Sequence, residues 1–300
     1  MTDGTGRAQA AGEGLLRGLI DMHIHTGPDV FPRSVDWIEA ARDAARAGMR
    51  AIVLKDHDIP TTDRAYLASR LVPEVTTVAS ITLNASVGGL NPWAVENALR
   101  RGAKVVWMPT VDARAFMEAA KRRPQLRWLI VRPHECGIRV VDDRGQLRPE
   151  LRPILRLISD YDAVLSAGHL AYDEMVRLFE AARAAGVRKL KVPHVQSPIG
   201  PTLEQQVELA REGVFLSYSP LNSLGPNPEV PFAAVVDMIR AVGIEQAVLI
   251  TDAGSASLPR PVELFRRFID QLLACGLRIE DITRMAAVNP ARLLGLEEED

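Results

Sequence analysis

The chain has 300 residues, of which 47% are hydrophobic and 25% charged, and its formal net charge is −2. This balance excludes the strongly basic surface of a nucleic-acid-binding protein and a polybasic membrane patch. No apolar run reaches the roughly 20 residues needed to span a bilayer. We therefore expect a small-molecule substrate as the partner, and neither nucleic acid nor membrane. Two cysteines are too few for a disulfide framework, which predicts a cytoplasmic location.

Apolar runs typical of strands alternate with amphipathic segments typical of helices along almost the whole chain. Residues 1–14 lack a signal-peptide pattern and are predicted to be a flexible leader, followed by one domain over residues 15–300. Asn91, Asp112 and Asn289 are expected to cap helix N-termini. The predicted strands cover residues 19–25, 49–54, 75–83, 103–108, 163–166, 190–192, 214–218 and 247–250. The predicted helices cover residues 35–47, 61–72, 92–101, 113–123, 151–160, 173–185, 203–211, 232–241 and 261–274, with a last helix starting at 289–290.

Eight strand-then-helix units predict a parallel sheet that closes into a single-domain (β/α)8 TIM-like barrel. A doubly wound open sheet is the alternative, and it is disfavoured because no Gly-x-Gly-x-x-Gly motif follows the first strand. Residues 129–150 interrupt the rhythm, and the turn residues 142–145 predict a small β-hairpin inserted before strand five. His134 in this insertion is expected to contact substrate if the segment folds over the barrel rim. A hairpin without a chemical role is the alternative.

The first predicted strand carries two histidines, His23 and His25, separated by one residue. Strand alternation places these histidines and Asp21 on one face, with Ile20, Met22 and Ile24 on the other. Two imidazoles on one face can bind a zinc, manganese or iron ion. Two unrelated polar residues near a turn are the alternative interpretation.

The remaining histidines strengthen the metal hypothesis, because most of them follow predicted strands. His57, His169 and His194 lie just past strands two, five and six. The carboxyl ends of barrel strands meet at one rim, so these side chains are predicted to converge with the pair on strand one. Asp252 follows strand eight, which neighbours strand one in a closed barrel. Separate hydrogen-bonded histidines are the alternative.

Taken together, the His-x-His motif, His169, His194 and Asp252 resemble the amidohydrolase superfamily of metal-dependent hydrolases. The segment from Asn289 to Leu296 looks like the closing segment of that superfamily. The resemblance covers about residues 19–296. It implies that His23 and His25 hold a more buried metal, that His169 and His194 hold a more exposed one, and that Asp252 contacts a metal and serves as the base.

The resemblance further implies one or two divalent ions, with Zn²⁺ expected and Mn²⁺ or Fe²⁺ as alternatives. The expected reaction is hydrolysis of an amide or cyclic amide C–N bond in a small molecule by metal-bound hydroxide. A lactone or phosphoester could be cleaved at the same site. Single-metal, non-hydrolytic decarboxylation and a non-catalytic barrel are rival hypotheses. The oligomeric state is left open, with a homo-oligomer among the outcomes.

One feature departs from the superfamily pattern. Strand four ends at Met108-Pro109-Thr110, without the lysine or glutamate that bridges two metals in many members. We hypothesise that Lys55, at the end of strand two, forms a bridging carbamate instead. A lysine paired with Asp58 or with a substrate anion is the alternative.

Five further residues are expected near the substrate or in the pocket. His57 is interpreted as a ligand or a substrate contact, Arg33 as a bidentate clamp for a substrate carboxylate, and Tyr218 as a pocket residue. Asn84 and Thr110 end strands three and four and are also expected to line the pocket. Trp107 is expected to pack against the outer helices, because it alternates with Met108.

Overall fold

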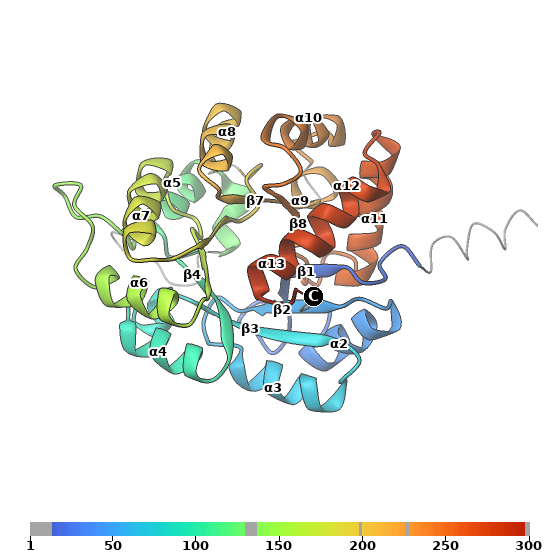
Figure 1. The fold of residues 1–300 in the computed structure, drawn as a ribbon, viewed down its shortest axis with the longest axis horizontal. Coiled ribbons are helices and arrows are strands. Elements are labelled where there is room, and N and C mark those ends of the chain that lie inside the picture. Colours follow the sequence, from blue (N-terminus) through green and yellow to red (C-terminus); the bar gives the residue numbers. More distant parts are fainter. Residues whose placement is uncertain (1–13, 130–136, 198–199, 226–227, 298–300) are drawn as a thin grey trace, which may run out of the picture.

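The computed structural model describes residues 14–129, 137–197, 200–225 and 228–297. Within these residues, eight parallel strands form one sheet in sequential order, and the helices surround it (Figure 1). The predicted (β/α)8 barrel is confirmed. The strands are β1 (Ile20–His25), β2 (Ala51–Lys55), β3 (Thr76–Thr82), β4 (Ala103–Trp107), β5 (Val164–Ser166), β6 (Lys189–Val192), β7 (Phe215–Tyr218) and β8 (Ala247–Leu249).

The helices follow the predicted order, with several short additions. The longer ones are α2 (Trp37–Arg46), α3 (Thr62–Leu71), α4 (Pro92–Arg100), α5 (Arg114–Arg122), α6 (Leu151–Asp160), α7 (Tyr172–Ala184), α8 (Leu203–Arg211), α10 (Phe232–Val242) and α11 (Pro261–Ala274). The shorter ones are α9 (Leu221–Leu224), α12 (Ile279–Thr283), α13 (Asn289–Leu294), the 3-10 helices η1 (Ala85–Val87) and η2 (Pro124–Leu129), and the π-helix η3 (Arg284–Val288).

One of the three predicted N-caps is confirmed. The Asn91 side chain accepts hydrogen bonds from two backbone N–H groups at the start of α4. The prediction for Asp112 is wrong, because α5 begins after Ala113 and the Asp112 carboxylate accepts from the backbone N–H of Ala85 instead. The prediction for Asn289 is also wrong, because α12, η3 and α13 run on without a break and its backbone is helical.

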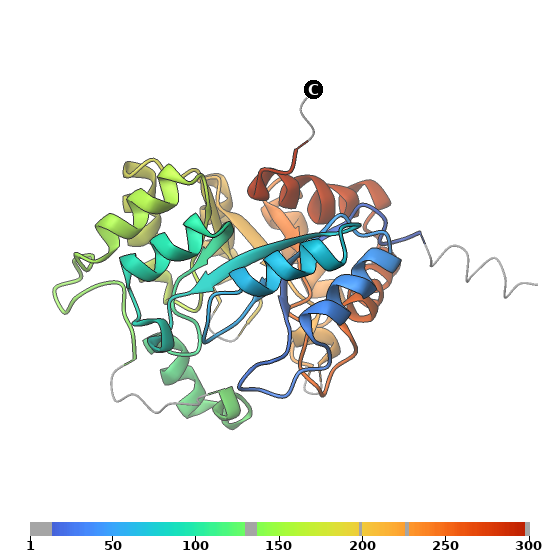
Figure 2. The ribbon, with the colours of Figure 1, turned by 90° about the horizontal axis from the view of Figure 1, so that it is seen from below.

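Apolar side chains pack on both faces of the barrel wall, as expected for a parallel sheet covered by helices. The outer layer joins the strands to the surrounding helices. The inner layer joins strand residues such as Met22 and Val53 to Leu293 and Leu294 of α13. Helix α13 therefore closes one end of the barrel, and η2 lies at the opposite end (Figure 2).

A bulge in β1 sets the direction of the two histidines. Ile20 and Asp21 pair with Ala51 and Ile52 of β2, but the next pair joins Ile24 to Leu54, so β1 has one extra residue. Met22 and His23 consequently both face the barrel interior. The predicted alternation is therefore wrong for this strand, since Asp21 does not share a face with the histidines.

The carboxylate of Asp21 instead fixes the seam between the first and last strands. It accepts hydrogen bonds from the backbone N–H groups of His23 and Thr251 at 3.1 Å and from the Thr251 hydroxyl at 2.6 Å. The seam is also joined by the Asp252 N–H, which donates to the His23 carbonyl at 2.9 Å, and by a bridge between Ile24 and Ala253. These bonds place Asp252 directly beside the two histidines.

Trp107 lies inside the barrel, so the prediction that it packs against the helices is wrong. Its ring is 4.7 Å from the His23 ring, and Met108 instead belongs to the outer layer. The alternation itself was correct, but the assignment of the inner and outer sides was reversed. Both sides of a barrel strand are apolar, so composition does not distinguish them.

The described part of the insertion contains a turn rather than two paired strands. A single antiparallel bridge joins Val141 to Leu147 and closes this turn, and a parallel bridge joins Ile138 to Ala113. His134 lies outside the described residues, as does the predicted leader apart from Gly14.

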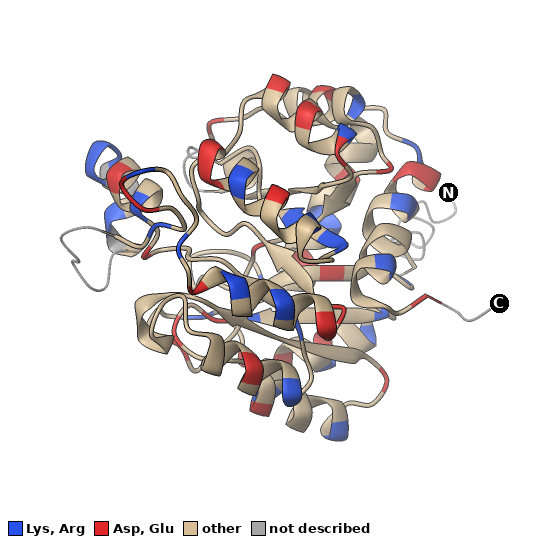
Figure 3. Ribbon diagram, turned by 60° about the vertical axis from the view of Figure 1, so that its left-hand side comes forward, with Lys and Arg blue, Asp and Glu red and all other residues tan. Residues whose placement is uncertain are grey.

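Basic and acidic residues are interspersed along the helices that Figure 3 brings forward. In the part of the chain that the structure describes, no helix combines the length and apolarity required to cross a membrane.

Candidate metal centre

His23, His25 and Asp252 form a compact cluster at the rim of the barrel. The Nε2 atoms of the two histidines are 3.3 Å apart, and both approach Asp252 Oδ1, at 2.9 Å from His23 and 3.2 Å from His25. All three ligand atoms lie within 4.8 Å of one another. Two imidazoles and one carboxylate are a donor set that suits zinc, manganese or iron. The cluster therefore fits a divalent cation.

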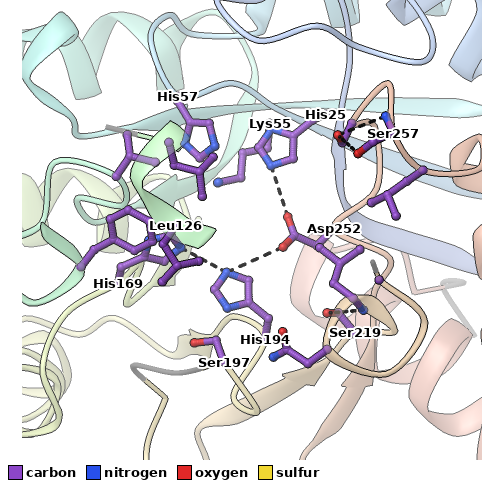
Figure 4. A pocket seen from close by; sticks show the side chains of 18 of the residues that line it. His25, Lys55, His57, Leu126, His169, His194, Ser197, Ser219, Asp252 and Ser257 are labelled. Atoms are coloured by element: carbon purple, nitrogen blue, oxygen red, sulfur yellow. Dashed lines mark hydrogen bonds and ion pairs between the residues drawn. The ribbon is translucent and has the colours of Figure 1, made fainter. Parts of the chain in front are cut away.

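His169 and His194 form a second pair beside this cluster (Figure 4). Their Nε2 atoms are 3.2 Å apart, and His194 Nε2 lies 4.0 Å from Asp252 Oδ2. The His194 ring is 5.8 Å from the His23 ring. The convergence predicted from the strand ends is therefore confirmed, and Asp252 faces both histidine pairs with its two oxygens.

Unusual backbone conformations position these side chains. Asp252 and His194 have positive φ angles of 54° and 30°, a region that Asp and His enter more often than most residues. Gly168 precedes His169 with φ +59°, and a Cβ there would lie 2.3 Å from the Met108 carbonyl oxygen. Strained backbone of this kind concentrates at functional sites.

The charge states follow from burial. Burial lowers the pKa of His23 well below its usual value and lowers that of His25 to about 3, with Arg33 and Lys55 adding to the shift of His25. Burial alone would raise the pKa of Asp252, but the surrounding imidazoles hold it well below its usual range. The cluster thus offers neutral imidazoles and an ionised carboxylate, the forms that bind metal.

Arg33 lies against this cluster, with Nη2 3.4 Å from His25 Nδ1. Its Nε and Nη2 donate to Asp29 Oδ2 at 3.0 and 2.8 Å. Arg33 also lines the cavity, so the bidentate clamp on a substrate carboxylate stays a prediction, with Asp29 already accepting from two of the guanidinium nitrogens. Since arginine only donates, its contact with His25 fixes the proton of that ring on Nε2, where a bound cation would replace it.

Two lysines are fully buried beside Trp107. Lys191 Nζ lies 4.5 Å and Lys55 Nζ 5.4 Å from the centre of the indole ring. Burial lowers the pKa of Lys55 to about 8 and that of Lys191 to about 7. Lys55 faces the pocket near His25, as predicted, whereas Asp56 points outward to Arg64. No carboxylate among the described residues forms an ion pair with either lysine.

Asn84 and Thr110 hold His57 in place and do not line the pocket as expected. The Thr110 hydroxyl lies 3.0 Å from His57 Nδ1, and Asn84 Nδ2 lies 2.9 Å from the same hydroxyl. The His57 ring stacks on the His25 ring at 4.8 Å. Burial lowers the pKa of His57 well below its usual value, with Lys55 contributing, so the ring is neutral.

Tyr218 faces away from the pocket, contrary to the prediction. It is fully buried in the outer layer, and its hydroxyl donates to Gln206 Oε1 of α8 at 3.2 Å. The alternation along β7 places Tyr218 outward, and Ser219 lines the pocket in its place.

His25, His169 and His194 open onto a cavity of about 290 Å³. One part of its wall is polar, with Lys55, Ser219 and Asp252. Apolar side chains also line the cavity, among them Phe116, whose ring lies 4.9 Å from the His169 ring. The other apolar residues of the wall are Val111, Leu126, Leu129, Leu221 and Leu258.

The sequence reasoning did not identify Lys191 or Phe116. A signal for Lys191 was present in the segment Lys189-Leu190-Lys191-Val192, where Leu190 and Val192 face the helices and alternation directs Lys191 inward. Phe116 gave no such signal, because an aromatic residue on an amphipathic helix is ordinarily assigned to the core.

The sequence profile described as "Family of unknown function (DUF6282)" matches residues 18–217. The chain belongs to this family. A comparison with curated proteins found no match.

Solved structures share the fold along nearly the whole chain. The probable dipeptidase PvdM from Pseudomonas aeruginosa is 13% identical, with a TM-score of 0.63 over 97% of this chain and 98% of the other. An organophosphorus hydrolase from Deinococcus radiodurans is also 13% identical, with a TM-score of 0.59 over 94% of each chain. An amidohydrolase from Pseudomonas aeruginosa is 13% identical, with a TM-score of 0.59 over 95% of this chain and 97% of the other. The predicted resemblance to the amidohydrolase superfamily is therefore confirmed in the fold.

Proposed function

We propose that this protein is a metal-dependent hydrolase of a small molecule. The observation that supports it most is the meeting of His23, His25 and Asp252 with a second histidine pair at the carboxyl ends of the barrel strands. The carboxyl end of the strands is where barrel enzymes build their active sites. Zn²⁺ is the metal that we propose first, with Mn²⁺ or Fe²⁺ as alternatives.

When bound, a divalent cation supplies Lewis acidity, which acidifies water and polarises a carbonyl or phosphoryl oxygen. His23 and His25 would hold the more buried ion, and His169 and His194 the more exposed one. Asp252 would take the proton of the attacking water and pass it to the leaving group. Its Oδ2 suits this role better than Oδ1, because Oδ1 already contacts both His23 and His25.

Lys55 is the candidate for a group that bridges two ions. Its neutral amine would react with carbon dioxide, forming an N–C bond and releasing one proton, to give a carbamate. Lys55 lines the same cavity as His25, His169 and His194, which supports this proposal. We expect the second equivalent of metal to require bicarbonate in the wild type and to be absent in Lys55→Met. Two equivalents bound by Lys55→Met would remove the hypothesis.

The cavity supports a compact substrate with an apolar group. Phe116 packs beside His169, and Leu126 lines the same cavity. We propose that the scissile bond is the C–N bond of an amide or cyclic amide. Lactone and phosphoester cleavage would use the same groups, because a lactone and a phosphoester each present an oxygen that a divalent cation can polarise.

The test combines metal analysis with a substrate panel. Purified protein should bind one or two equivalents of a divalent metal and should hydrolyse at least one compound among cyclic amides, lactones and phosphotriesters. Asp252→Asn should abolish most of this turnover, whereas Asp63→Asn, the same change at a largely exposed carboxylate on α3, should not. Absence of metal from protein purified without chelators would overturn the proposal. Release of carbon dioxide from an acid without incorporation of water would instead indicate a decarboxylase.

A further inference from the structure

A chain of hydrogen bonds leads from two buried strand ends to His57. Asn84 Oδ1 accepts the backbone N–H of Thr110 at 2.8 Å, and Asn84 Nδ2 donates to the His57 carbonyl at 3.0 Å. A backbone N–H only donates and a carbonyl only accepts, so these two bonds fix the orientation of the Asn84 amide. Its second N–H therefore donates to the Thr110 hydroxyl at 2.9 Å.

The hydrogen of the Thr110 hydroxyl has one acceptor. Thr110 is fully buried, and within the described residues its hydroxyl contacts only Asn84 Nδ2 and His57 Nδ1. Because the Asn84 nitrogen is a donor, the hydroxyl must donate to His57 Nδ1 or leave its hydrogen unpaired, which is costly in a buried site. His57 Nδ1 is therefore the acceptor, and the single proton of the neutral ring lies on Nε2.

The other side of the ring is directed into the cavity. His57 lines the cavity together with His25 and Lys55, and its Nε2 has no hydrogen-bond partner among the described residues (Figure 4). Stacking on His25 keeps the two rings together at an interplanar angle of 26°. A polarised N–H thus faces the cavity beside the cluster of His23, His25 and Asp252.

We propose that Asn84 and Thr110 lock His57 in its Nε2–H form, so that the ring donates a hydrogen bond to an oxygen of the substrate. The chemical class that this donor recognises is a carbonyl or phosphoryl oxygen carrying developing negative charge. His57 is then a catalytic residue and neither a metal ligand nor a base, whereas Asn84 and Thr110 are positioning residues. The substrate role of His57 rests on the hydrolase proposal, but its tautomer does not.

The tautomer can be measured directly by NMR of protein labelled with ¹⁵N-histidine, with His57 assigned by comparison with His57→Gln. Wild-type protein should show an unprotonated Nδ1 and a protonated Nε2 with and without added Zn²⁺. Thr110→Ser should keep this pattern, and Thr110→Val should raise the population of the Nδ1–H form. A protonated Nδ1 in the wild type, or an unchanged tautomer in Thr110→Val, would overturn the proposal even if no substrate were found.

Kinetics and metal content test the role of the donor. His57→Ala should lower kcat about 100-fold with little change in KM, as expected when one donor to a developing oxyanion is lost. His57→Gln should recover part of this loss because its amide can also donate, and both variants should keep the metal content of the wild type. Loss of metal in His57→Ala, or an effect on KM alone, would refute the assigned role and would leave the hydrolase proposal standing.

Discussion

Lys191 is expected to destabilise the barrel at neutral pH, and Lys191→Met should relieve this cost. The lysine is fully buried in β6, and within the described residues its Nζ has no hydrogen-bond partner. Burial lowers its pKa from 10.5 to about 7. Methionine keeps an unbranched side chain of similar length against Trp107 without an ionisable group.

The size of the stability change follows from the pKa of Lys191 in the unfolded chain, 10.5, and in the folded protein, about 7. Between pH 7 and pH 10.5 the unfolded lysine binds a proton that the folded lysine has released, so the free energy of unfolding rises with pH. The cost of burying Lys191 is then about 4 kcal/mol at pH 7 and about 1 kcal/mol at pH 10. The stability advantage of Lys191→Met should shrink by about 3 kcal/mol over this range.

The assay is urea denaturation of both proteins at several pH values from 7 to 10, in the presence of a chelator. Lys189→Met is the matched control, since this lysine lies two residues away on β6 and bonds Asp162 at the surface. Lys189→Met should change the free energy of unfolding by less than about 1 kcal/mol, as is typical when an ion pair at the surface is removed. A difference between Lys191→Met and wild type that stays constant with pH would refute the reasoning, because it would mean that the folded protein solvates or pairs the Lys191 ammonium.

Three further outcomes are expected. Asp252→Asn should lower kcat about 100-fold while the far-UV circular dichroism spectrum stays unchanged, and a rate within threefold of wild type would exclude Asp252 as the base. Removal of metal with a chelator should lower Tm, since free metal at about 100 times its Kd stabilises the folded state by about 2.7 kcal/mol; an equal Tm with and without metal would contradict binding at the folded site. Gly254→Ala should cost about 2 kcal/mol in urea denaturation, because its φ is +131° and a Cβ would lie 2.0 Å from the His25 carbonyl oxygen. Wild-type stability in Gly254→Ala would show that the loop after β8 can move away from His25.

The sequence by itself determined the barrel and the set of residues at its mouth. Short apolar runs separated by amphipathic segments are local patterns, and they located all eight strands. His169, His194 and Asp252 could be grouped with His23 because a closed parallel barrel brings strand ends together. That geometric rule depends only on where each strand ends.

The tertiary structure alone decided which way several side chains face and what they contact. One extra residue in β1 turned Met22 and His23 to the same side, and a strictly alternating pattern cannot reveal such an insertion. Trp107 and Tyr218 were assigned to the wrong sides, because barrel strands are apolar on both faces and carry no polar face as a reference. Asp29, which occupies the guanidinium of Arg33, became evident only once the loop after β1 was folded. Strand ends follow from local sequence, whereas side-chain direction and pairing depend on neighbours that are distant along the chain.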